Sequence, residues 1–169
     1  MNAFAVALLV LAPGLAAAAP EPGVEAQALG KFKDWDAYKL TRNGETTCYA
    51  VSNPKETTPK NVTRDQVFFM ISNWPGRKIT GEPSVIAGYA YRDGSTVELR
   101  VGSAKFELYT KDDSAWFADA ADEKKFVTAM KSGSSMTVKG TSTRGTITTD
   151  KYSLSGISSA LDKINSACK

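Results

Sequence analysis

The C-terminal stretch SSMTVKGTSTRGTITTDKYSLSGISSALDKINSACK, residues 134–169, holds the densest set of structural signals in the chain. Apolar and polar residues alternate over 136–139, as on a half-buried strand. Gly140 and Gly145 then mark a turn, and the β-branched run 146–149 favours a second strand. The stretch therefore predicts two antiparallel strands joined by a turn.

A helix is predicted directly after these strands. Ser155 is a suitable N-cap, and apolar residues then recur with helical spacing. These are Ile157, Ala160, Leu161, Ile164 and Cys168. The spacing places them on one stripe of the helix, so we expect the last cysteine to face the core.

Strand-like runs also fill the chain before this stretch. Their predicted ranges are 35–41, 46–52, 66–74, 85–91, 96–101, 105–110 and 114–118. Asn43-Gly44, between the first two runs, predicts a type I′ hairpin turn. The apolar run VFFMI, residues 67–71, favours a strand covered on both faces.

A first helix is predicted over 120–132. Asp119 is its expected N-cap, acidic residues occupy its first turn, and Gly133 is its expected stop. Many short strands with turn signals between them are typical of an antiparallel β-sandwich. The fold class we expect is mainly β: a sandwich of immunoglobulin-like architecture with two short helices, the second C-terminal.

The N-terminal residues predict export. Residues 1–18 carry no charged side chain and end in small residues, which is typical of a secretory signal peptide. Residues 19–31 are rich in Pro, Gly, Ala and Glu and are expected to form a flexible lead into one domain, 32–169. We expect a periplasmic, outer-membrane or surface-associated protein with no transmembrane span after cleavage.

The charge balance limits the classes of partner that the chain is expected to bind. The chain has 21 basic and 18 acidic residues, a formal charge of +3, with the two signs interleaved. No basic stripe indicates a nucleic-acid partner, and no polybasic run indicates a membrane anchor. Peripheral contact with an anionic outer-membrane surface stays open.

The composition also limits the chemistry, because the chain contains no histidine. Catalysis by Ser-His-Asp or Cys-His groups is excluded within this chain, and we expect no metal and no cofactor. Three carboxylate or hydroxyl groupings are candidate sites, and we interpret them as structural or solvated: Asp34 with Asp36, Asp112 with Asp113, and Lys151 with Ser153. We expect a protein that is not an enzyme.

Cys48 and Cys168 are the two cysteines of the chain. In an exported protein they are expected to form a disulfide, which in the chain-entropy account would contribute roughly 4–5 kcal/mol for a loop of this length. Two separate buried thiols, or pairing between molecules, remain the alternatives. If the bond forms, it fastens the C-terminal helix to the strand that follows Asn43-Gly44.

Motifs in the C-terminal half resemble the invasion-associated locus B family. The positions that carry the resemblance most clearly are Gly140, Ser142, Gly145, Thr146, Tyr152, Ser153, Leu154, Gly156, Ala160 and Leu161. Earlier blocks, Cys48-Tyr49-Ala50 and Gly88-Tyr89, and also Trp116, are similar to the family's. The resemblance implies a secreted, mostly β bacterial protein, linked in some members to host-cell invasion, and brings no catalytic residues.

We interpret the signature glycines as turn positions and Tyr152 and Leu154 as packing residues. Arg144, on the turn between the two predicted strands, is the candidate contact with a partner, because a guanidinium on a supported loop offers a bidentate donor. Three hypotheses follow: a non-enzymatic protein that contacts proteins or host cells, a periplasmic helper of envelope assembly that presents an open sheet edge, and a carboxylate-based enzyme acting on cell-wall glycan.

Overall fold

The computed structural model describes residues 24–169, and its fold is mainly β. One antiparallel sheet of 11 strands is accompanied by two α-helices, the second at the C-terminus, which confirms the predicted class. The predicted signal peptide, residues 1–18, lies outside the described residues.

The strands are β1 Val24–Phe32, β2 Trp35–Arg42, β3 Glu45–Ser52, β4 Glu56–Thr58, β5 Phe68–Trp74, β6 Ile79–Ile86, β7 Thr96–Val101, β8 Ala104–Lys111, β9 Ser114–Trp116, β10 Ser135–Thr141 and β11 Ile147–Ser153. The helices are α1 Ala120–Ser132 and α2 Ile157–Ala167, with a 3-10 turn η1 at Pro75–Arg77. Along the sheet the strands run in the order β1-β2-β3-β5-β6-β9-β8-β7-β10-β11-β4.

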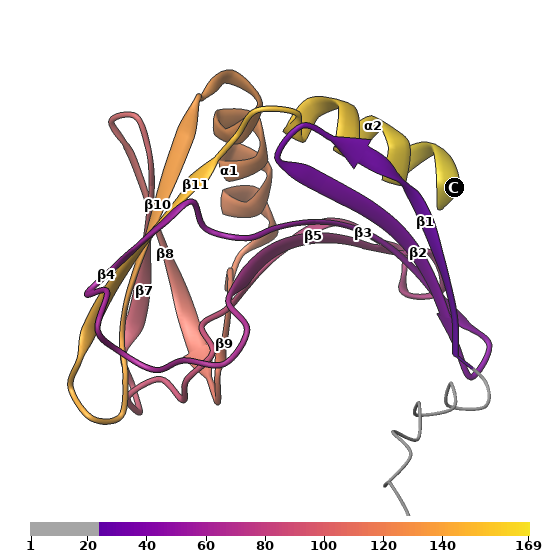
Figure 1. Cartoon of the computed structure of the whole chain (residues 1–169). Helices are drawn as coiled ribbons and strands as arrows, with labels where there is room; N and C mark the ends of the chain where they lie inside the picture. The colour runs from indigo at the N-terminus through magenta and orange to yellow at the C-terminus, as the bar shows by residue number, and fades with distance from the viewer. Residues whose placement is uncertain (1–23) are drawn as a thin grey trace, which may run out of the picture.

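The sheet bends sharply, so that its two halves stand at an angle (Figure 1). Strands β1, β2, β3 and β5 form an arch, and α2 lies over the convex side of that arch, in contact with all four strands. Helix α1 stands between the arch and the second half, which contains β7, β8, β10 and β11. Two halves of one continuous sheet thus form the two layers that the sequence predicted as a sandwich.

The core lies where the arch, the helices and the second half meet. Phe69 of β5 is fully buried, and its ring centroid lies 5.7 Å from that of Phe126 of α1 and 6.0 Å from that of Tyr152 of β11. The apolar stripe of α2 is buried against the arch, as its helical spacing predicted. Tyr152 and Leu154 are both buried, which agrees with a packing role for these signature residues.

The predicted flexible lead is wrong from Val24 onward, because this segment forms β1. It pairs antiparallel with β2 from Val24 opposite Arg42 to Phe32 opposite Trp35, with a bulge at Gly30. An edge strand with exposed side chains needs no alternation of apolar and polar residues, since the hydrogen bonds to its neighbour hold it. Composition alone therefore gave no strand signal here.

The predicted coverage of β5 on both faces is also wrong. Phe69 and Ile71 are fully buried beneath the helices, but Phe68, Met70 and Trp74 on the other face are only half-buried. Apolar residues on both faces of a strand do not require two covering layers. Here the second apolar face lines a hollow on the concave side of the arch.

Other predicted boundaries differ less. The Asn43-Gly44 turn has both residues at positive φ, 51° and 81°, as a type I′ turn requires. Helix α1 begins and ends where predicted, with the Asp119 carboxylate accepting hydrogen bonds from two backbone amides. Strand β6 begins and ends earlier in the chain than the predicted range 85–91. Pro83 does not interrupt it, because β9 pairs only with Ser84–Ile86 and Pro83 therefore has a single neighbouring strand.

Candidate functional site

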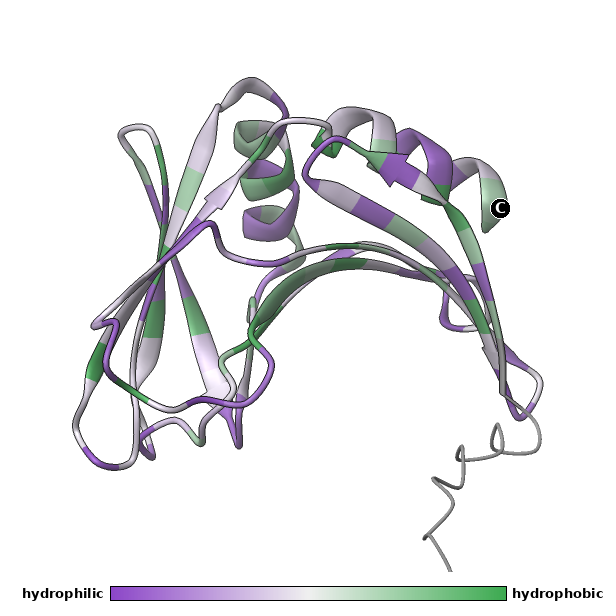
Figure 2. Cartoon of the chain, viewed as in Figure 1, coloured by the Kyte–Doolittle hydropathy of each residue, from purple (hydrophilic) through white to green (hydrophobic). Residues whose placement is uncertain are grey.

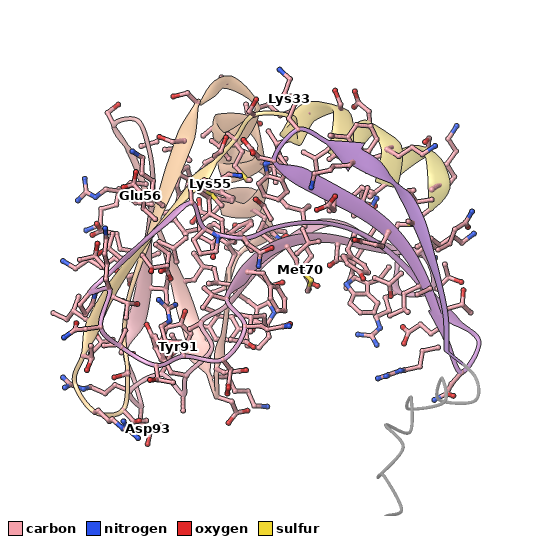
Figure 3. All side chains as sticks on the ribbon, viewed as in Figure 1. Lys33, Lys55, Glu56, Met70, Tyr91 and Asp93 are labelled. Atoms are coloured by element: carbon pink, nitrogen blue, oxygen red, sulfur yellow. A yellow bond between two sulfur atoms is a disulfide. The ribbon has the colours of Figure 1, made fainter. Side chains whose placement is uncertain are left out.

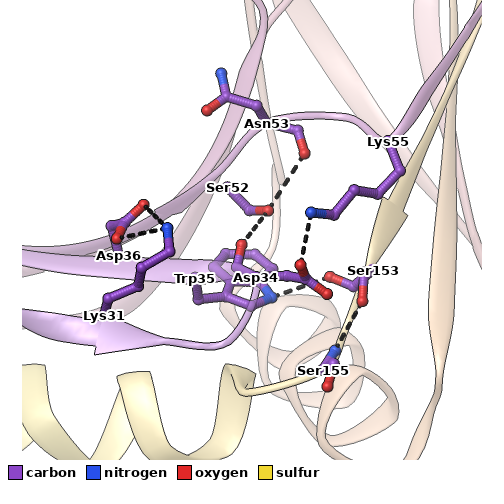
Figure 4. A network of polar contacts seen from close by, with 9 residues as sticks. All are labelled: Lys31, Asp34, Trp35, Asp36, Ser52, Asn53, Lys55, Ser153 and Ser155. Carbon is purple, nitrogen blue, oxygen red and sulfur yellow. Dashed lines mark hydrogen bonds and ion pairs between the residues drawn. The ribbon is translucent and has the colours of Figure 1, made fainter.

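The signature segment holds the start of the domain to its C-terminal end (Figure 4). The indole Nε1 of Trp35 donates a hydrogen bond of 3.0 Å to the carbonyl oxygen of Ser153. The backbone amide of Asp34 donates to the carbonyl oxygen of Ser155 at 3.2 Å. We call this arrangement, in which the β1–β2 turn grips the segment before α2, the clasp.

Gly156 explains why the signature contains a glycine at the start of α2. Its φ is +97°, and a Cβ at this position would collide with the backbone carbonyl of Phe32. The predicted cap Ser155 is therefore wrong by one residue, because Gly156 occupies the N-cap position and allows the close approach of the β1–β2 turn. Beyond it, Ala160 and Leu161 are buried against the sheet.

A disulfide joins the other end of α2 to the arch. Cys48 of β3 and Cys168, which caps α2, are bonded, with their Cα atoms 5.9 Å apart. Cys48 is fully buried, whereas Cys168 keeps some exposure, so the predicted core position holds only in part for the last cysteine. The clasp and the disulfide fix α2 over the convex side of the arch from both of its ends.

A buried ion pair that the sequence reasoning missed lies beside the signature. Arg64, from the loop before β5, donates to both carboxylate oxygens of Asp150 at 2.8 and 2.7 Å, and also to the carbonyl oxygen of Ala87. Its guanidinium lies 5.0 Å from the ring centroid of Tyr89, whose hydroxyl contacts Thr148 at 2.6 Å. Three segments far apart in sequence therefore meet in one network, and its donors and acceptors pair with one another.

Arg144 lies where the sequence placed it, exposed on the turn between β10 and β11. Gly145 follows at φ +83°, and the Ser142 hydroxyl accepts a hydrogen bond from the amide of Thr146, which fixes the turn. A polar hollow of about 560 Å³ borders this loop and the Arg64 network. The contact role of Arg144 stays a prediction.

Asp34 and Asp36 are not brought together as a catalytic pair. Asp34 lies 2.6 Å from the Lys55 ammonium, and this ion pair, then Ser153, hold the pKa of Asp34 below its usual value. Asp36 pairs separately with Lys31 at 3.1 Å. Among residues 24–169 no cluster of three or more Cys, Asp or Glu side chains is arranged to bind a metal.

The concave side of the arch forms a hollow. Seven large apolar side chains line it, all half-buried, and we call them the open face: Tyr38, Leu40, Tyr49, Val51, Phe68, Met70 and Trp74. The groove that they form encloses about 800 Å³. Figure 3 shows Met70 projecting from the arch into the space beneath it.

Strand register explains why these side chains share one surface. Residues directly opposite each other on antiparallel strands point to the same face, and Tyr38 stands opposite Tyr49, with their rings stacked at 5.4 Å. Val51 stands opposite Met70 in the same way. The alternate residues face α2 and the core, so β2, β3 and β5 each carry two apolar faces, and only one of the two is covered. Figure 2 shows hydrophobic residues along the arch.

One end of the groove is charged. Arg77 of η1 donates to both Glu45 oxygens, at 2.6 and 3.0 Å, and its guanidinium lies 4.7 Å from the ring centroid of Trp74. Arg42, opposite Glu45, borders the same end. The Trp74 indole also donates to Glu82 at 3.0 Å, and Glu45 and Glu82 both raise the pKa of Arg77, so guanidiniums and carboxylates stand together at this end.

One known protein family matches most of the chain. The family described as invasion associated locus B protein matches residues 35–165. The chain belongs to this family. No curated protein and no solved structure matches it. Within the described residues, no helix has the length and apolar character needed to cross a membrane.

The family match begins at Trp35, the residue that binds Ser153 in the clasp. The C-terminal signature positions thus lie in the clasp, on α2, and in β10, β11 and the turn between them. Tyr49, from the earlier block Cys48-Tyr49-Ala50, lies on the open face. The sequence reasoning missed the open face because it assigned the apolar residues of β5 to a buried strand. The available signal was the aromatic character of alternate residues on β2 and β3, Tyr38 and Tyr49, which stand in register across the hairpin.

Proposed function

We propose that this protein is exported and works without catalysis, by holding a partner against the open face of its arch. The observation that carries the proposal is an apolar, aromatic surface on three adjacent strands that no described helix covers. Exposed apolar surfaces of this kind mark binding sites in folded proteins. Contact at the envelope or with a host cell is the use that membership of the invasion associated locus B family suggests.

Two features support export. The Cys48–Cys168 disulfide is of a kind that forms and persists in oxidising compartments outside the cytoplasm. The uncharged, apolar run at residues 1–18 has the composition of a secretory signal peptide. The compartment we propose is the periplasm or the outer membrane, including its outer surface.

The absence of catalysis is part of the proposal and rests on the chemistry of the chain. It contains no histidine, and its candidate carboxylates Asp34 and Asp36 are each held by a separate lysine. The hollow under the arch is lined mainly by apolar side chains, with charges only near one end. Such a surface suits binding and orientation better than proton transfer.

A second candidate, the envelope-assembly helper, is favoured by one observation. Strand β1 is the first strand of the sheet order and has β2 as its only neighbour among the described strands. An edge of this kind can pair with an extended segment of another protein by strand addition. The two candidates differ in which surface touches the partner: the open face in the first, the β1 edge in the second.

The experiment is site-specific photocrosslinking in living cells. A photoreactive residue replaces Met70 on the open face, Gln27 on the β1 edge, or Ile147, an exposed apolar residue on β11 that serves as the control. The proposal predicts a discrete crosslinked product from position 70 and none from position 147. Products from position 27 alone would replace it with the helper function, and products from no position would reject both.

Protease digestion of the same cells tests the compartment. Cleavage on intact cells places the protein on the outer surface, and cleavage only after the outer membrane is permeabilised places it in the periplasm. Protection in both preparations, with a periplasmic control protein digested after permeabilisation, would contradict export.

A further inference from the structure

We propose that two copies of this chain associate through their β1 edges, pairing antiparallel about a two-fold axis at Ala26. Their two open faces then join into one continuous surface. The inference goes beyond the proposed function, because it assigns the β1 edge to a second copy of the chain and not to a client protein. It rests on the geometry of the edge and is independent of what the open face holds.

The two edges of the sheet differ in how they are protected. Strand β4, at one edge, has three residues and stands between Pro54 and Pro59, and both shortness and proline hinder the addition of another strand. Strand β1, at the other edge, has nine residues and no proline. Among the described residues β2 is its only neighbouring strand, and no loop or helix forms a backbone hydrogen bond with it. The β1 edge is therefore free to pair.

The residues of β1 allow another strand to approach closely. Ala26, Gln27 and Ala28 are all exposed, and the two alanines carry only a methyl group. The bulge after Ala28, where Gly30 has a φ of +143°, shifts the register with β2 and ends the regular stretch. Regular pairing is thus limited to residues 24–28, and Ala26 is the middle residue of this stretch.

This stretch is complementary to itself when two copies run antiparallel. With Ala26 on the axis, each Ala26 stands opposite the other, residue 25 stands opposite residue 27, and residue 24 stands opposite residue 28. Glutamate then meets glutamine and valine meets alanine, so no pair joins two like charges, which would be destabilising. Because Gln27 stands opposite Lys39 of β2, Lys39 of each copy also falls in one row with Glu25 of the other. Residues of opposite charge therefore flank the axis.

Pairing at Ala26 joins the two open faces. Ala26 stands opposite Leu40 of β2, so the row that crosses the axis runs from Leu40 through both Ala26 residues to the second Leu40. Leu40 belongs to the open face, and residues in one row of an antiparallel sheet point to the same side. A two-fold axis perpendicular to the sheet keeps both concave sides on that side, and each α2 stays on the convex side (Figure 1). The dimer thus presents one apolar surface built from β2, β3 and β5 of both copies.

A second copy fits this edge better than an extended segment of another protein. The same two-fold axis gives the facing edges the same curvature, so the two arches follow one another. A disordered segment would lose backbone conformational entropy on pairing, whereas β1 is already ordered by β2. The regular stretch is short and buries less than the about 1,200–2,000 Å² of a stable interface, so we expect a weak dimer with a dissociation constant of about 1–100 µM.

The test is sedimentation equilibrium of the purified chain over concentrations that span this range. We expect monomers and dimers but no larger species, because the β4 edge is protected. Ala26→Lys and Ala26→Glu should each weaken the dimer by about fivefold or more, since each places two like charges opposite one another on the axis. An equimolar mixture of the two variants should restore the dimer, because opposite charges then face each other. Ile147→Lys, the matched change on exposed β11, should leave the dimer unchanged, and thermal melts show that each variant is folded.

Disulfide trapping locates the axis. Cysteines at position 26 would have their Cβ atoms about 4.5–5.5 Å apart in the dimer, so Ala26→Cys should form an intermolecular bond under mild oxidation. Ala28→Cys is the matched control, because it lies on the same strand and the same face and is also exposed. Positions 28 of the two copies would be four residues apart along the strands, about 13 Å, which is too far for a disulfide.

Four results would overturn the inference. These are a monomer at every concentration, a dimer that Ala26→Lys leaves intact, a mixture of the charged variants that stays monomeric, and equal trapping at positions 26 and 28. If any of them occurs while position 70 still crosslinks to a partner in cells, the proposed function stands and the dimer falls. In cells the dimer predicts a product from position 27 with the mass of two chains. A product of any other mass at that position would assign the edge to a client protein and contradict the dimer.

Discussion

The indole nitrogen of Trp35 donates a hydrogen bond of 3.0 Å to the carbonyl oxygen of Ser153, 118 residues further along the chain. Trp35 is fully buried at the first residue of β2, and Ser153 is the last residue of β11. The bond therefore joins the arch to the second half of the sheet at the point where α2 begins. It gives the N–H of the buried indole its hydrogen-bond partner.

Trp35→Phe tests how much this hydrogen bond contributes to the stability of the fold. The variant keeps an aromatic ring but leaves the Ser153 carbonyl without its partner, so we expect a loss of about 1–3 kcal/mol in the free energy of unfolding. Urea denaturation followed by circular dichroism measures it. Trp116→Phe, a half-exposed tryptophan on β9, is the matched control, and an equal loss in both variants would show that the bond does not matter.

Gly156→Ala tests the close approach of the clasp. The substitution places a Cβ against the Phe32 carbonyl and puts alanine at φ +97°, which alone costs about 1–3 kcal/mol. We expect a lower melting temperature and faster proteolysis before α2. Gly76→Ala, where a Cβ meets no atom within 4 Å, should have little effect. Equal melting temperatures for the two variants would contradict the account.

Arg64→Met tests the buried ion pair. The Arg64 and Asp150 side chains are 7% and 3% exposed, so removing the guanidinium strands a carboxylate in the interior and should cost about 3–5 kcal/mol. Arg77→Met breaks an exposed pair with Glu45 and should lower the free energy of unfolding far less. Chemical denaturation of the two variants compares these losses. A similar loss in both variants would mean that burial does not determine how much the Arg64–Asp150 pair contributes to stability.

The pH dependence of stability tests the contact between Asp34 and Lys55. Because the pKa of Asp34 is lowered by Lys55 and then Ser153, its ionised form stabilises the fold above the unfolded pKa of about 3.9. This contribution is lost as the pH falls through the lower folded pKa. Urea midpoints at about pH 6 and about pH 2.5 should therefore fall less in Asp34→Asn than in the wild type. Lys55→Gln should reduce the same dependence, and an unchanged wild-type slope in both variants would refute it.

Local signals in the sequence were sufficient for much of the fold. The Asn43-Gly44 turn, the caps of α1 and the apolar stripe of α2 depend on neighbours within a few residues, so their patterns predicted them. Strand β1 carries no such pattern, because its position depends on pairing with β2. The Arg64–Asp150 pair joins residues 86 apart, and no local pattern indicates which arginine will meet a given carboxylate.

The candidate site likewise contains one feature that the sequence predicted and one that it did not. The cysteine pairing was predicted, because an exported chain with two cysteines offers one intramolecular pairing. The open face was not predicted, because an apolar run such as VFFMI does not say whether one or both of its faces are covered. That depends on where the helices lie: α2 packs on the convex side of the arch, and α1 stands between the arch and the second half of the sheet (Figure 1).

The most direct test of the open face is methyl NMR of methionine-labelled protein during titration with anilinonaphthalene sulfonate, a probe that binds exposed hydrophobic surfaces. Met70 lies on the open face, whereas Met130 and Met136 are buried in the core, so the chain contains its own controls. Binding at the open face predicts that the Met70 methyl resonance shifts in a saturable way while those of Met130 and Met136 stay in place. A stationary Met70 resonance, or equal shifts of all three, would contradict binding at this surface.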